Sequence, residues 1–475
     1  MEFDKDLLAR QEARELAKAA QSAQRQLAGM SQSQLDKIVE TIAKAFSKEA
    51  PMLALMAVEE TGFGNVEDKI TKNRFASERV ANAVRNMKTV GILREDPKEK
   101  LWEIGVPVGV ICGIVPSTNP TSTVCYKAMI ALKAGNSIVF SPHPKAIVCT
   151  RKAAEIVAKA AEAAGAPVGS VGCLSIGSMA GCQELMGADQ VRLILATGGP
   201  AMVRSAYSSG KPAIGVGAGN GPAYIHHSAD VGKALDCIRR SKSFDNGTVC
   251  ASEQSIIVTK EMEQQVRQEG QRRGFYFMNP QEAASLAKLL FRPNGALNPE
   301  IVGKTALYLA QMAGFSVPND TKVLVADEQE AGPTRPYSME KLCPVLAFFV
   351  MDSEDAVLKK VIEVLFHEGA GHTFAIHAQD RAVIEKFALQ VPVSRLLVNT
   401  PAALGGIGAS TGLFPALTLG CGAVGGSSSS NNISPLDLSN IRRVAWAMEQ
   451  KAAPKVECSD DLVELLTRKI MERLG

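Results

Sequence analysis

The chain alternates between short apolar runs and alanine-rich amphipathic stretches, and this alternation restricts the fold more than any other feature. Between residues 102 and 225, NSIVF, SVGCLSI and VRLILAT are typical of strands, and KAIVCTRKAAEIVAKAAEAAG predicts a helix that ends at Gly165. A second alternation follows Cys250, with a helix expected over 261–291. Strands that alternate with helices favour a parallel sheet covered on both faces, so we expect an α/β protein.

The bulk properties limit the classes of protein that the chain can belong to. Its 475 residues indicate two or three domains, and a net charge of +3 gives no electrostatic basis for binding nucleic acid or a membrane surface. The N-terminus lacks an apolar signal-peptide core, and no run reaches the roughly 18 apolar residues of a membrane span. The ten cysteines are scattered singly, which favours reduced thiols over disulfides or zinc. We therefore expect a cytoplasmic protein.

Three turns, two of them rich in glycine, follow predicted strands and are candidates for holding a dinucleotide. They are FSPHP at 140–144, ATGGP at 196–200 and GVGAGNG at 215–221. Glycine lets a backbone approach a phosphate, and helix N-termini offer free N–H donors to an anion. None of the three is a GxGxxG followed by an acidic residue, so tight turns without a ligand are the alternative interpretation.

Cys250 is the candidate nucleophile, because an Asp-Asn-Gly turn precedes it and an apolar strand follows it. Backbone donors at such a turn stabilise a thiolate, although an isolated cysteine is more often a small buried hydrophobe. Asn119, in PSTNPT, is a candidate oxyanion donor, and its alternative role is an ordinary Asn-Pro turn. His367 and His372, in HEGAGHT, do not have HExxH spacing, so we expect no metal.

The last sixteen residues form a separate amphipathic segment. Leu462, Leu466, Ile470 and Leu474 recur every four residues and would form one apolar stripe on a helix over 460–474. A polar, proline-containing link precedes this segment. It is either a terminal helix docked on its own domain or a tethered helix that binds another protein.

Seven motifs occur in an order that identifies a family. FDNGTVCASEQSIIV, PSTNPT, AGNSIVFSPHP, ATGGP, EKLCPVLAF, HEGAGHT and LGCGAVGGSSSSNNI closely resemble those of the CoA-acylating aldehyde dehydrogenases, including the aldehyde dehydrogenase half of the bifunctional aldehyde–alcohol dehydrogenases. The resemblance spans about residues 15–450. It implies an aldehyde dehydrogenase-like fold with a Rossmann-like cofactor domain, an α/β catalytic domain and a small oligomerisation extension.

The resemblance also implies domain boundaries. We expect N-terminal helices and the dinucleotide-binding domain over 1–225, with a strand excursion for oligomerisation near 100–112. The catalytic domain is expected over 226–424 and a returning oligomerisation segment over 425–450. The amphipathic helix is then a tethered segment at 459–475, a possible microcompartment-targeting peptide.

The resemblance assigns roles to the site residues. Cys250 attacks the aldehyde, Asn119 and the Cys250 N–H hold the oxyanion, hydride passes to the nicotinamide, and coenzyme A takes the acyl group from the cysteine, all reversibly. The implied cofactor-binding residues are Ser141, Pro142, His143, Thr197, Gly198, Gly199, Gly217 and Glu340. His367 and His372 are expected near the mouth of the site, positioning coenzyme A or substrate.

One residue separates acyl transfer from hydrolysis. Val216 stands where the hydrolytic aldehyde dehydrogenases carry a glutamate that activates water, and valine cannot act as a base. A hydrolytic enzyme, an acyl-phosphate reductase and a non-catalytic scaffold remain the alternatives. The resemblance implies NAD as cofactor. NADP is not excluded, because FSPHP has no acid that would contact the adenosine ribose.

The substrate and partners follow from the family alone. Acetaldehyde, propionaldehyde and a charged two-carbon aldehyde are all candidates, and Arg335 would meet a charged one unless it is a surface arginine. The family implies a homo-oligomer, either a dimer or a tetramer. Some relatives work inside bacterial microcompartments, so the 460–474 helix is a candidate for binding a shell or cargo partner there. We expect no nucleic-acid or membrane partner.

Overall fold

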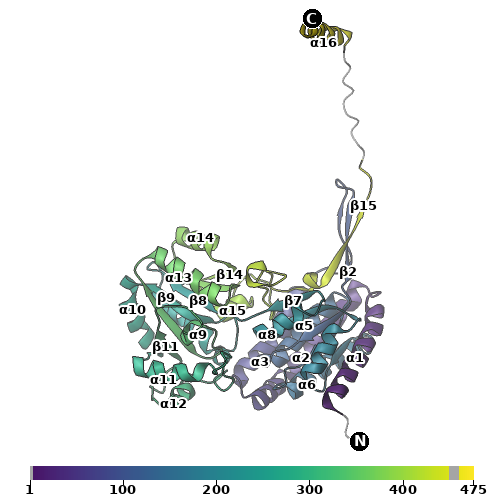
Figure 1. The fold of residues 1–475 in the computed structure, drawn as a ribbon. Coiled ribbons are helices and arrows are strands. Elements are labelled where there is room, and N and C mark those ends of the chain that lie inside the picture. Colours follow the sequence, from purple (N-terminus) through teal and green to yellow (C-terminus); the bar gives the residue numbers. More distant parts are fainter. Residues whose placement is uncertain (1–3, 449–458) are drawn as a thin grey trace.

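The computed structural model describes residues 4–448 and 459–475, which form two parallel sheets, a small antiparallel sheet and a C-terminal helix (Figure 1). The N-terminal region is helical, as expected. It consists of α1 (Lys5–Leu27), α2 (Gln32–Thr61), α3 (Val66–Arg74), a π-helical turn at Phe75–Arg79 and α4 (Val80–Val84). Ser31 and Gln34 form a capping box that begins α2, and Gly62 ends it with a φ of 69°.

The first parallel sheet has five strands in the order β5-β4-β3-β6-β7. Its strands are β3 (Val110–Ile114), β4 (Ser137–Ser141), β5 (Val171–Cys173), β6 (Val191–Thr197) and β7 (Ala213–Val216). The connecting helices are α5 (Pro120–Lys133), α6 (Ile147–Ala163), α7 (Met179–Gly187) and α8 (Pro200–Tyr207). This order reverses between β3 and β6, which makes the carboxyl ends of those strands a ligand-binding switch point.

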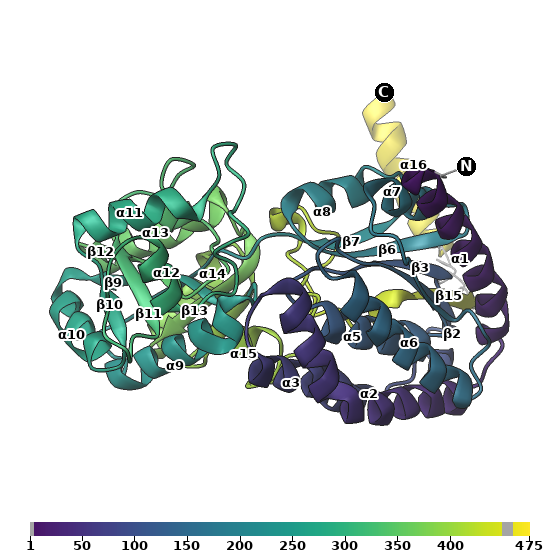
Figure 2. The ribbon, with the colours of Figure 1, turned by 90° about the horizontal axis from the view of Figure 1, so that it is seen from below.

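Alternate residues of these strands enter two different cores. Ile111 and Leu195 pack with the core under α2, α5 and α6, whereas Cys112 and Ile194 pack with the core under α1 and α7. Figure 2 shows these helices on opposite faces of the sheet. Both faces are therefore buried, which accounts for the nearly continuous apolar runs of the sequence.

The second parallel sheet has seven strands in the order β10-β11-β12-β9-β8-β13-β14. Its strands are β8 (Gly221–Ile225), β9 (Glu253–Thr259), β10 (Phe275–Phe277), β11 (Val323–Asp327), β12 (Val345–Met351), β13 (Gly371–His377) and β14 (Val393–Val398). Its helices are α9 (Val231–Ser243), α10 (Lys260–Gln271), α11 (Pro280–Leu290), α12 (Ala306–Met312), α13 (Glu354–His367), α14 (Arg381–Gln390) and α15 (Ala402–Gly406).

Three expected boundaries were wrong. Because β8 pairs with β9 and β13, the first domain ends before Gly221 rather than at 225. The helix expected over 261–291 is interrupted by β10, which adds an edge strand to the second sheet. Segment 403–438 follows β14 but contributes apolar side chains to the core of the first domain, so it does not belong wholly to the catalytic domain.

The small sheet is antiparallel and extends away from the body. It consists of β1 (Gly91–Asp96), β2 (Leu101–Pro107) and β15 (Ser439–Ala445), with β2 in the centre. Trp102 and Trp446 pack edge to face with ring centroids 5.0 Å apart. The excursion expected near 100–112 lies at 91–107 instead, since β3 is the central strand of the first parallel sheet.

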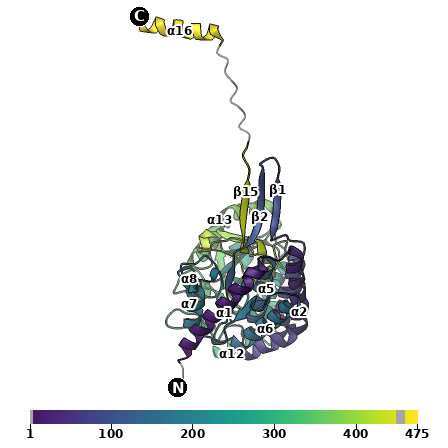
Figure 3. The ribbon, with the colours of Figure 1, turned by 90° about the vertical axis from the view of Figure 1, so that its right-hand side faces the viewer.

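The C-terminal helix α16 (Asp460–Leu474) has no buried residue (Figure 3). Its apolar side chains are all exposed, with Leu474 at 80% and Met471 at 69% of full accessibility. The last expected helix therefore exists, and its apolar face is covered by none of the described residues. No helix within 4–448 or 459–475 is long and apolar enough to cross a membrane.

Candidate active site

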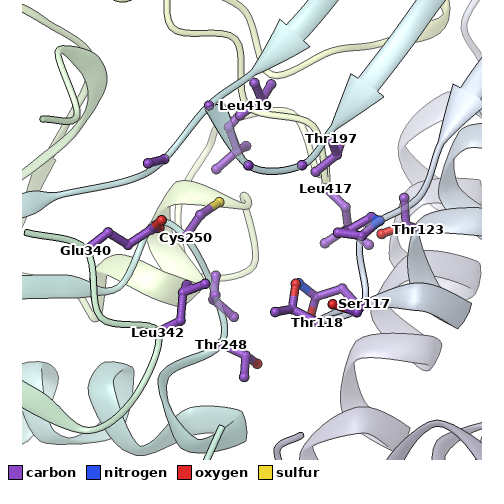
Figure 4. Close-up of a pocket in the computed structure, with 18 of the residues that line it drawn as sticks. Ser117, Thr118, Thr123, Thr197, Thr248, Cys250, Glu340, Leu342, Leu417 and Leu419 are labelled. Atoms are coloured by element: carbon purple, nitrogen blue, oxygen red, sulfur yellow. The ribbon is translucent and has the colours of Figure 1, made fainter. Parts of the chain in front are cut away.

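Cys250 lines a cavity of about 210 Å³ between the two parallel sheets. One side of the cavity is built from the segment after β3, which carries Ser117, Thr118 and Asn119. Figure 4 shows the sulfur of Cys250 and the carboxylate of Glu340 close together on the opposite side. The sequence-predicted Cys250, Asn119 and Glu340 are thus brought together in one cavity.

The turn before Cys250 adopts an unusual backbone conformation. Asp245, Asn246 and Gly247 have φ angles of 47°, 51° and 78°, so two consecutive non-glycine residues occupy the left-handed region. Such conformations persist where the surroundings hold them. The Asp245 side chain is held by four donors, namely Lys69 Nζ, Lys72 Nζ, Thr248 Oγ1 and the Asn65 N–H. The turn that presents the nucleophile is therefore fixed from α3.

Burial raises the pKa of the Cys250 thiol to about 12, and the neighbouring Glu340 and Cys421 add to the effect. The guanidinium of Arg395 acts in the opposite direction. At neutral pH the thiol of the ligand-free protein is therefore protonated, since a thiol ionises only near its pKa. Proton removal has to accompany the reaction of this cysteine.

Asn119 caps the N-terminus of α5 by backbone only, because its side chain makes no capping hydrogen bond. Instead its Oδ1 accepts a hydrogen bond of 2.6 Å from Lys72 Nζ, and its Nδ2 donates to Thr118 Oγ1 at 3.2 Å. An ammonium can only donate, so this contact sets which end of the amide faces Lys72. The second Nδ2 hydrogen remains for a ligand in the cavity.

A largely apolar cleft continues from this cavity along the carboxyl ends of β3, β4 and β6. Its lining contains the sequence-predicted Ser141, Pro142, His143, Thr197, Gly198 and Gly199. Pro200 begins α8 without an N–H, and the Met202 and Val203 N–H groups donate to the Gly199 carbonyl oxygen at 3.0 and 3.1 Å, so the Ala201 N–H is the donor of that turn left for an anion. This cleft lies at the topological switch point, where open α/β sheets bind their ligands.

Gly217 and Glu340 line the part of the cavity that adjoins this cleft. Glu340 Oε1 accepts a hydrogen bond from the Gly219 N–H at 2.9 Å, and the Glu340 N–H donates to Glu368 Oε2 at 2.6 Å. Burial, together with the charge of Glu368, raises the pKa of Glu340 to about 8. Glu340 is therefore a carboxyl held in the site by backbone hydrogen bonds rather than a solvated surface charge.

Val216 ends β7 and lines the same cavity, with 2% of its surface exposed. Among the described residues that line the cavity, Glu340 carries the single carboxylate. The remaining wall is apolar and is formed by Leu342, Ile407, Leu417 and Leu419. This wall suits an uncharged aliphatic group beside the nucleophile.

The two histidines of HEGAGHT lie apart. His367 lines a second cleft with Arg204, Tyr207 and Phe366, and this cleft shares Gly217 and Ala218 with the Cys250 cavity. His372 is fully buried in β13, its Nδ1 lies 2.8 Å from Thr373 Oγ1, and burial lowers its pKa to about 3. The expectation that His372 contacts coenzyme A or substrate was wrong, because β13 turns it into the protein interior.

Two further sequence candidates are also placed. Arg335 is partly exposed and pairs with Glu330 at 2.6 Å, away from the Cys250 cavity, so it is a surface arginine. Among residues 4–448 and 459–475 there is no cluster of three or more metal-ligating side chains. The side chains of Lys72, Asp245 and Thr248 carried no prediction. For Lys72 the reason is that lysines spaced three apart on a polar helix, such as Lys69 and Lys72, usually face solvent.

A cysteine and an asparagine amide in one cavity, beside a cleft at the switch point of a parallel sheet, are the kinds of group that dehydrogenases with a thioester intermediate use. The sequence profile of the aldehyde dehydrogenase family matches residues 6–273, more than half of the chain. The chain therefore belongs to the aldehyde dehydrogenase family. This confirms the predicted fold class and the family predicted from the seven motifs.

Particular relatives are more specific. The bifunctional aldehyde-alcohol dehydrogenase of Escherichia coli (strain K12) is 45% identical over 440 residues, covering 91% of this chain and 49% of that protein. The chain thus spans about half the length of this curated relative. An acetylating aldehyde dehydrogenase from Geobacillus thermoglucosidasius is 49% identical with a TM-score of 0.92, covering 95% of this chain and 99% of that one.

A third relative is a propionaldehyde dehydrogenase from the fucose utilisation bacterial microcompartment of Clostridium phytofermentans. Its structure is 29% identical with a TM-score of 0.83, and the match covers 92% of this chain and 97% of that one. The chain is therefore similar over nearly its whole length to acylating aldehyde dehydrogenases.

Proposed function

We propose that the chain oxidises a small aldehyde to an acyl-CoA, with NAD as electron acceptor and coenzyme A as acyl acceptor, in a reversible reaction. The observation that carries this proposal is the pairing of Cys250 with Val216 in one cavity. A thioester formed on Cys250 has no glutamate at that position to activate water, so a stronger nucleophile than water is required. The similarity to an acetylating aldehyde dehydrogenase supports the same reaction.

The proposed steps use residues that line one cavity. Cys250 Sγ loses its proton and attacks the aldehyde carbon, while the Asn119 amide and the Cys250 N–H stabilise the carbonyl oxygen as it becomes an oxyanion. The nicotinamide, when bound, accepts the hydride that leaves this carbon. The oxyanion then re-forms a carbonyl as the thioester. The thiolate of coenzyme A adds to this carbonyl, and the Cys250 thiolate departs to leave acyl-CoA.

The proposed cofactor residues are Ser141, Pro142, His143, Thr197, Gly198, Gly199, Gly217 and Glu340. NAD rather than NADP is supported by charge, because the described residues that line the cleft beside β4 include neither lysine nor arginine. Recognition of a 2′-phosphate usually uses such a cation. Burial lowers the pKa of His143, and the nearby Lys145 lowers it further, so this histidine is also neutral at pH 7.

The proposed substrate is acetaldehyde or propionaldehyde. The apolar wall of Leu342, Ile407, Leu417 and Leu419 would pack against a short alkyl group. Arg335 pairs with Glu330 on the surface, so it supplies no counter-ion for a charged aldehyde in the cavity. His367, on the cleft next to Gly217, is the remaining histidine proposed to contact coenzyme A.

Assembly and location form a separate part of the proposal. We propose a dimer or tetramer formed through the sheet of β1, β2 and β15, and a cytoplasmic enzyme that α16 directs into a bacterial microcompartment. The support is the exposed apolar stripe of α16 and the similarity to a microcompartment propionaldehyde dehydrogenase. Such a stripe is what docking on a partner helix or groove requires.

The first experiment measures NADH formation from acetaldehyde or propionaldehyde with and without coenzyme A, with products identified by mass. CoA-dependent NADH formation with accumulating acyl-CoA is the expected result. Free acid formed in steady turnover without coenzyme A would indicate the hydrolytic alternative. The Cys250→Ala variant serves as the control, because it should lose all turnover while NAD binding remains measurable by calorimetry.

A further inference from the structure

A buried ionic cluster lies beneath the Cys250 cavity and joins the N-terminal helices to the nucleophile turn. Its centre is the carboxylate of Asp245, which is fully buried. Lys69 Nζ lies 3.0 Å and Lys72 Nζ 2.5 Å from Asp245 Oδ2, and both lysine side chains are 4% exposed. Two cations therefore face the Asp245 carboxylate, and the Asp68 carboxylate, which accepts from the Asp245 N–H at 2.7 Å, lies beside them.

Lys72 is the member of this cluster that reaches the cavity. Its ammonium donates to Asp245 Oδ2 at 2.5 Å, to Asn119 Oδ1 at 2.6 Å and to Thr248 Oγ1 at 3.0 Å. An ammonium has three donors, so all three are used. Each acceptor belongs to a segment that builds the site, namely the nucleophile turn and the segment before α5. Lys72 of α3 therefore holds both segments through a single atom, its Nζ.

We propose that Lys72 is a positioning residue of the oxyanion hole, an assignment that rests on the proposed role of Asn119. Because Lys72 holds the amide oxygen, the Asn119 NH₂ group faces away from it, with one hydrogen on Thr118 and the other free for the substrate oxygen. The ammonium also polarises the amide, which makes its N–H a stronger donor to an oxyanion. Donors aimed in advance at developing charge are a large part of catalysis in a site that excludes water.

Asp245 extends this function to the nucleophile. The same carboxylate holds Lys72 and the left-handed turn that leads to Cys250, with Thr248 Oγ1 donating to it at 2.7 Å. A displacement of α3 would thus move the oxyanion donor and the nucleophile together and preserve the distance between them. Asp245 therefore stabilises the left-handed conformation of this turn and, through Lys72, also orders the oxyanion hole.

The chain offers a matched control in Lys69. Lys69 is as deeply buried as Lys72 and binds the same Asp245 oxygen, but its other contact is the backbone oxygen of Thr118 at 2.9 Å and not the Asn119 amide. Lys72→Met and Lys69→Met each remove one cation from Asp245, retain the length of the aliphatic stem and leave one lysine paired with the carboxylate. The two variants differ in the contacts with Asn119 and Thr248, which only Lys72 makes, and in the contact with the Thr118 backbone oxygen, which only Lys69 makes.

The test compares the pre-steady-state rate of NADH formation in the full-length enzyme for Lys72→Met, Lys69→Met, Asn119→Ala and the Lys72→Met/Asn119→Ala double variant. Removal of an oxyanion donor costs about 10²- to 10³-fold in rate. We expect a loss of about 10- to 100-fold for Lys72→Met in kcat with KM nearly unchanged, and a loss several times smaller for Lys69→Met. In the double variant, Lys72→Met should cost little beyond Asn119→Ala, because its effect passes through the amide.

Two outcomes overturn the proposal. Equal losses in the two lysine variants would assign the effect to the charge on Asp245, and an additive double variant would show that Lys72 acts independently of Asn119. Lys72→Gln retains a neutral donor to the Asn119 amide, so it should recover part of the kcat that Lys72→Met loses. If Lys72 had a purely structural role, the loss of kcat in each variant would instead follow the decrease in its melting temperature. If the parent enzyme forms no acyl-CoA, the proposed function fails and the comparison of variants is not reached.

Discussion

Gly219 packs so closely against the Cys250 backbone that no side chain fits at this position, and this contact makes a sharp prediction. A Cβ built on Gly219 lies 1.9 Å from the Cys250 carbonyl oxygen and 2.8 Å from its carbonyl carbon. Carbon and oxygen atoms that are not bonded lie about 3.5 Å apart, so Gly219→Ala must separate the two backbones by roughly 1.5 Å. The atoms that the new Cβ would meet first belong to the Cys250 backbone, so no side-chain rotation relieves the contact.

The expected cost follows from this displacement. The Cys250 N–H is a proposed oxyanion donor, and the Gly219 N–H holds Glu340 at 2.9 Å. A misplacement of about 1 Å lowers the rate of a positioned reaction by about 10²-fold. We therefore expect kcat to fall about 100-fold, which corresponds to about 2.7 kcal/mol in the activation free energy. Overpacking at one site costs about 1–3 kcal/mol of stability, so the variant is expected to remain folded.

The assay is acyl-CoA-coupled NADH formation together with a thermal melt of the same preparation. Gly412→Ala is the control, because a Cβ at Gly412 meets no atom within 4 Å and the residue lies outside the Cys250 cavity. This control should retain parental kcat. A Gly219→Ala enzyme that keeps kcat within about fivefold would refute the argument, since the backbone would have moved at no cost to the site.

The remaining predictions concern the thiol, hydrolysis and the C-terminal helix. Burial places the pKa of Cys250 near 12, so the iodoacetamide rate of the ligand-free enzyme should rise about tenfold per pH unit from pH 7 to 8, and a plateau below pH 9 would contradict the burial argument. Glu340→Gln removes a neighbouring negative charge that raises this pKa, so alkylation at pH 9 should become faster. Val216→Glu should produce free acid without coenzyme A, detectable by mass, by supplying a base that typically contributes about 10²-fold or more. Deleting residues 459–475 should leave turnover unchanged and abolish co-sedimentation with purified microcompartments; loss of the fold would instead assign α16 a structural role.

Much of the fold could be predicted because the chemistry that fixes it is local. The apolar composition of β4, β6 and β9 by itself indicates strands that are buried on both faces. The sheet to which a strand belongs is not local information. β8 follows β7 after four residues, Gly217–Asn220, yet it pairs with β9 and β13 in the other sheet. The sequence between the two strands contains no long polar linker that would indicate a domain boundary.

The site was predicted unevenly for a similar reason. Cys250 is preceded by an Asp-Asn-Gly turn, a signal readable over a few residues, and Asn119 was identified by resemblance. Lys72 lies far from both in sequence and becomes part of the site only when α3 packs against the nucleophile turn. Its position on a polar helix predicts a solvated lysine. Only the tertiary structure shows that the polar face of α3 is turned inward towards a buried carboxylate.

Burial of Cys250 has two opposite consequences for acyl transfer. It makes the thiolate unfavourable, since the pKa of the free thiol lies near 12, and the same apolar surroundings disfavour the water that would hydrolyse a thioester. A hydrolytic enzyme has to admit water and activate it, whereas the cavity here has Val216 at the position for that base and an apolar wall around the nucleophile. The small thiolate fraction of Cys250 in the ligand-free enzyme is thus compatible with acyl transfer, provided that the lifetime of the thioester exceeds the time that coenzyme A needs to arrive.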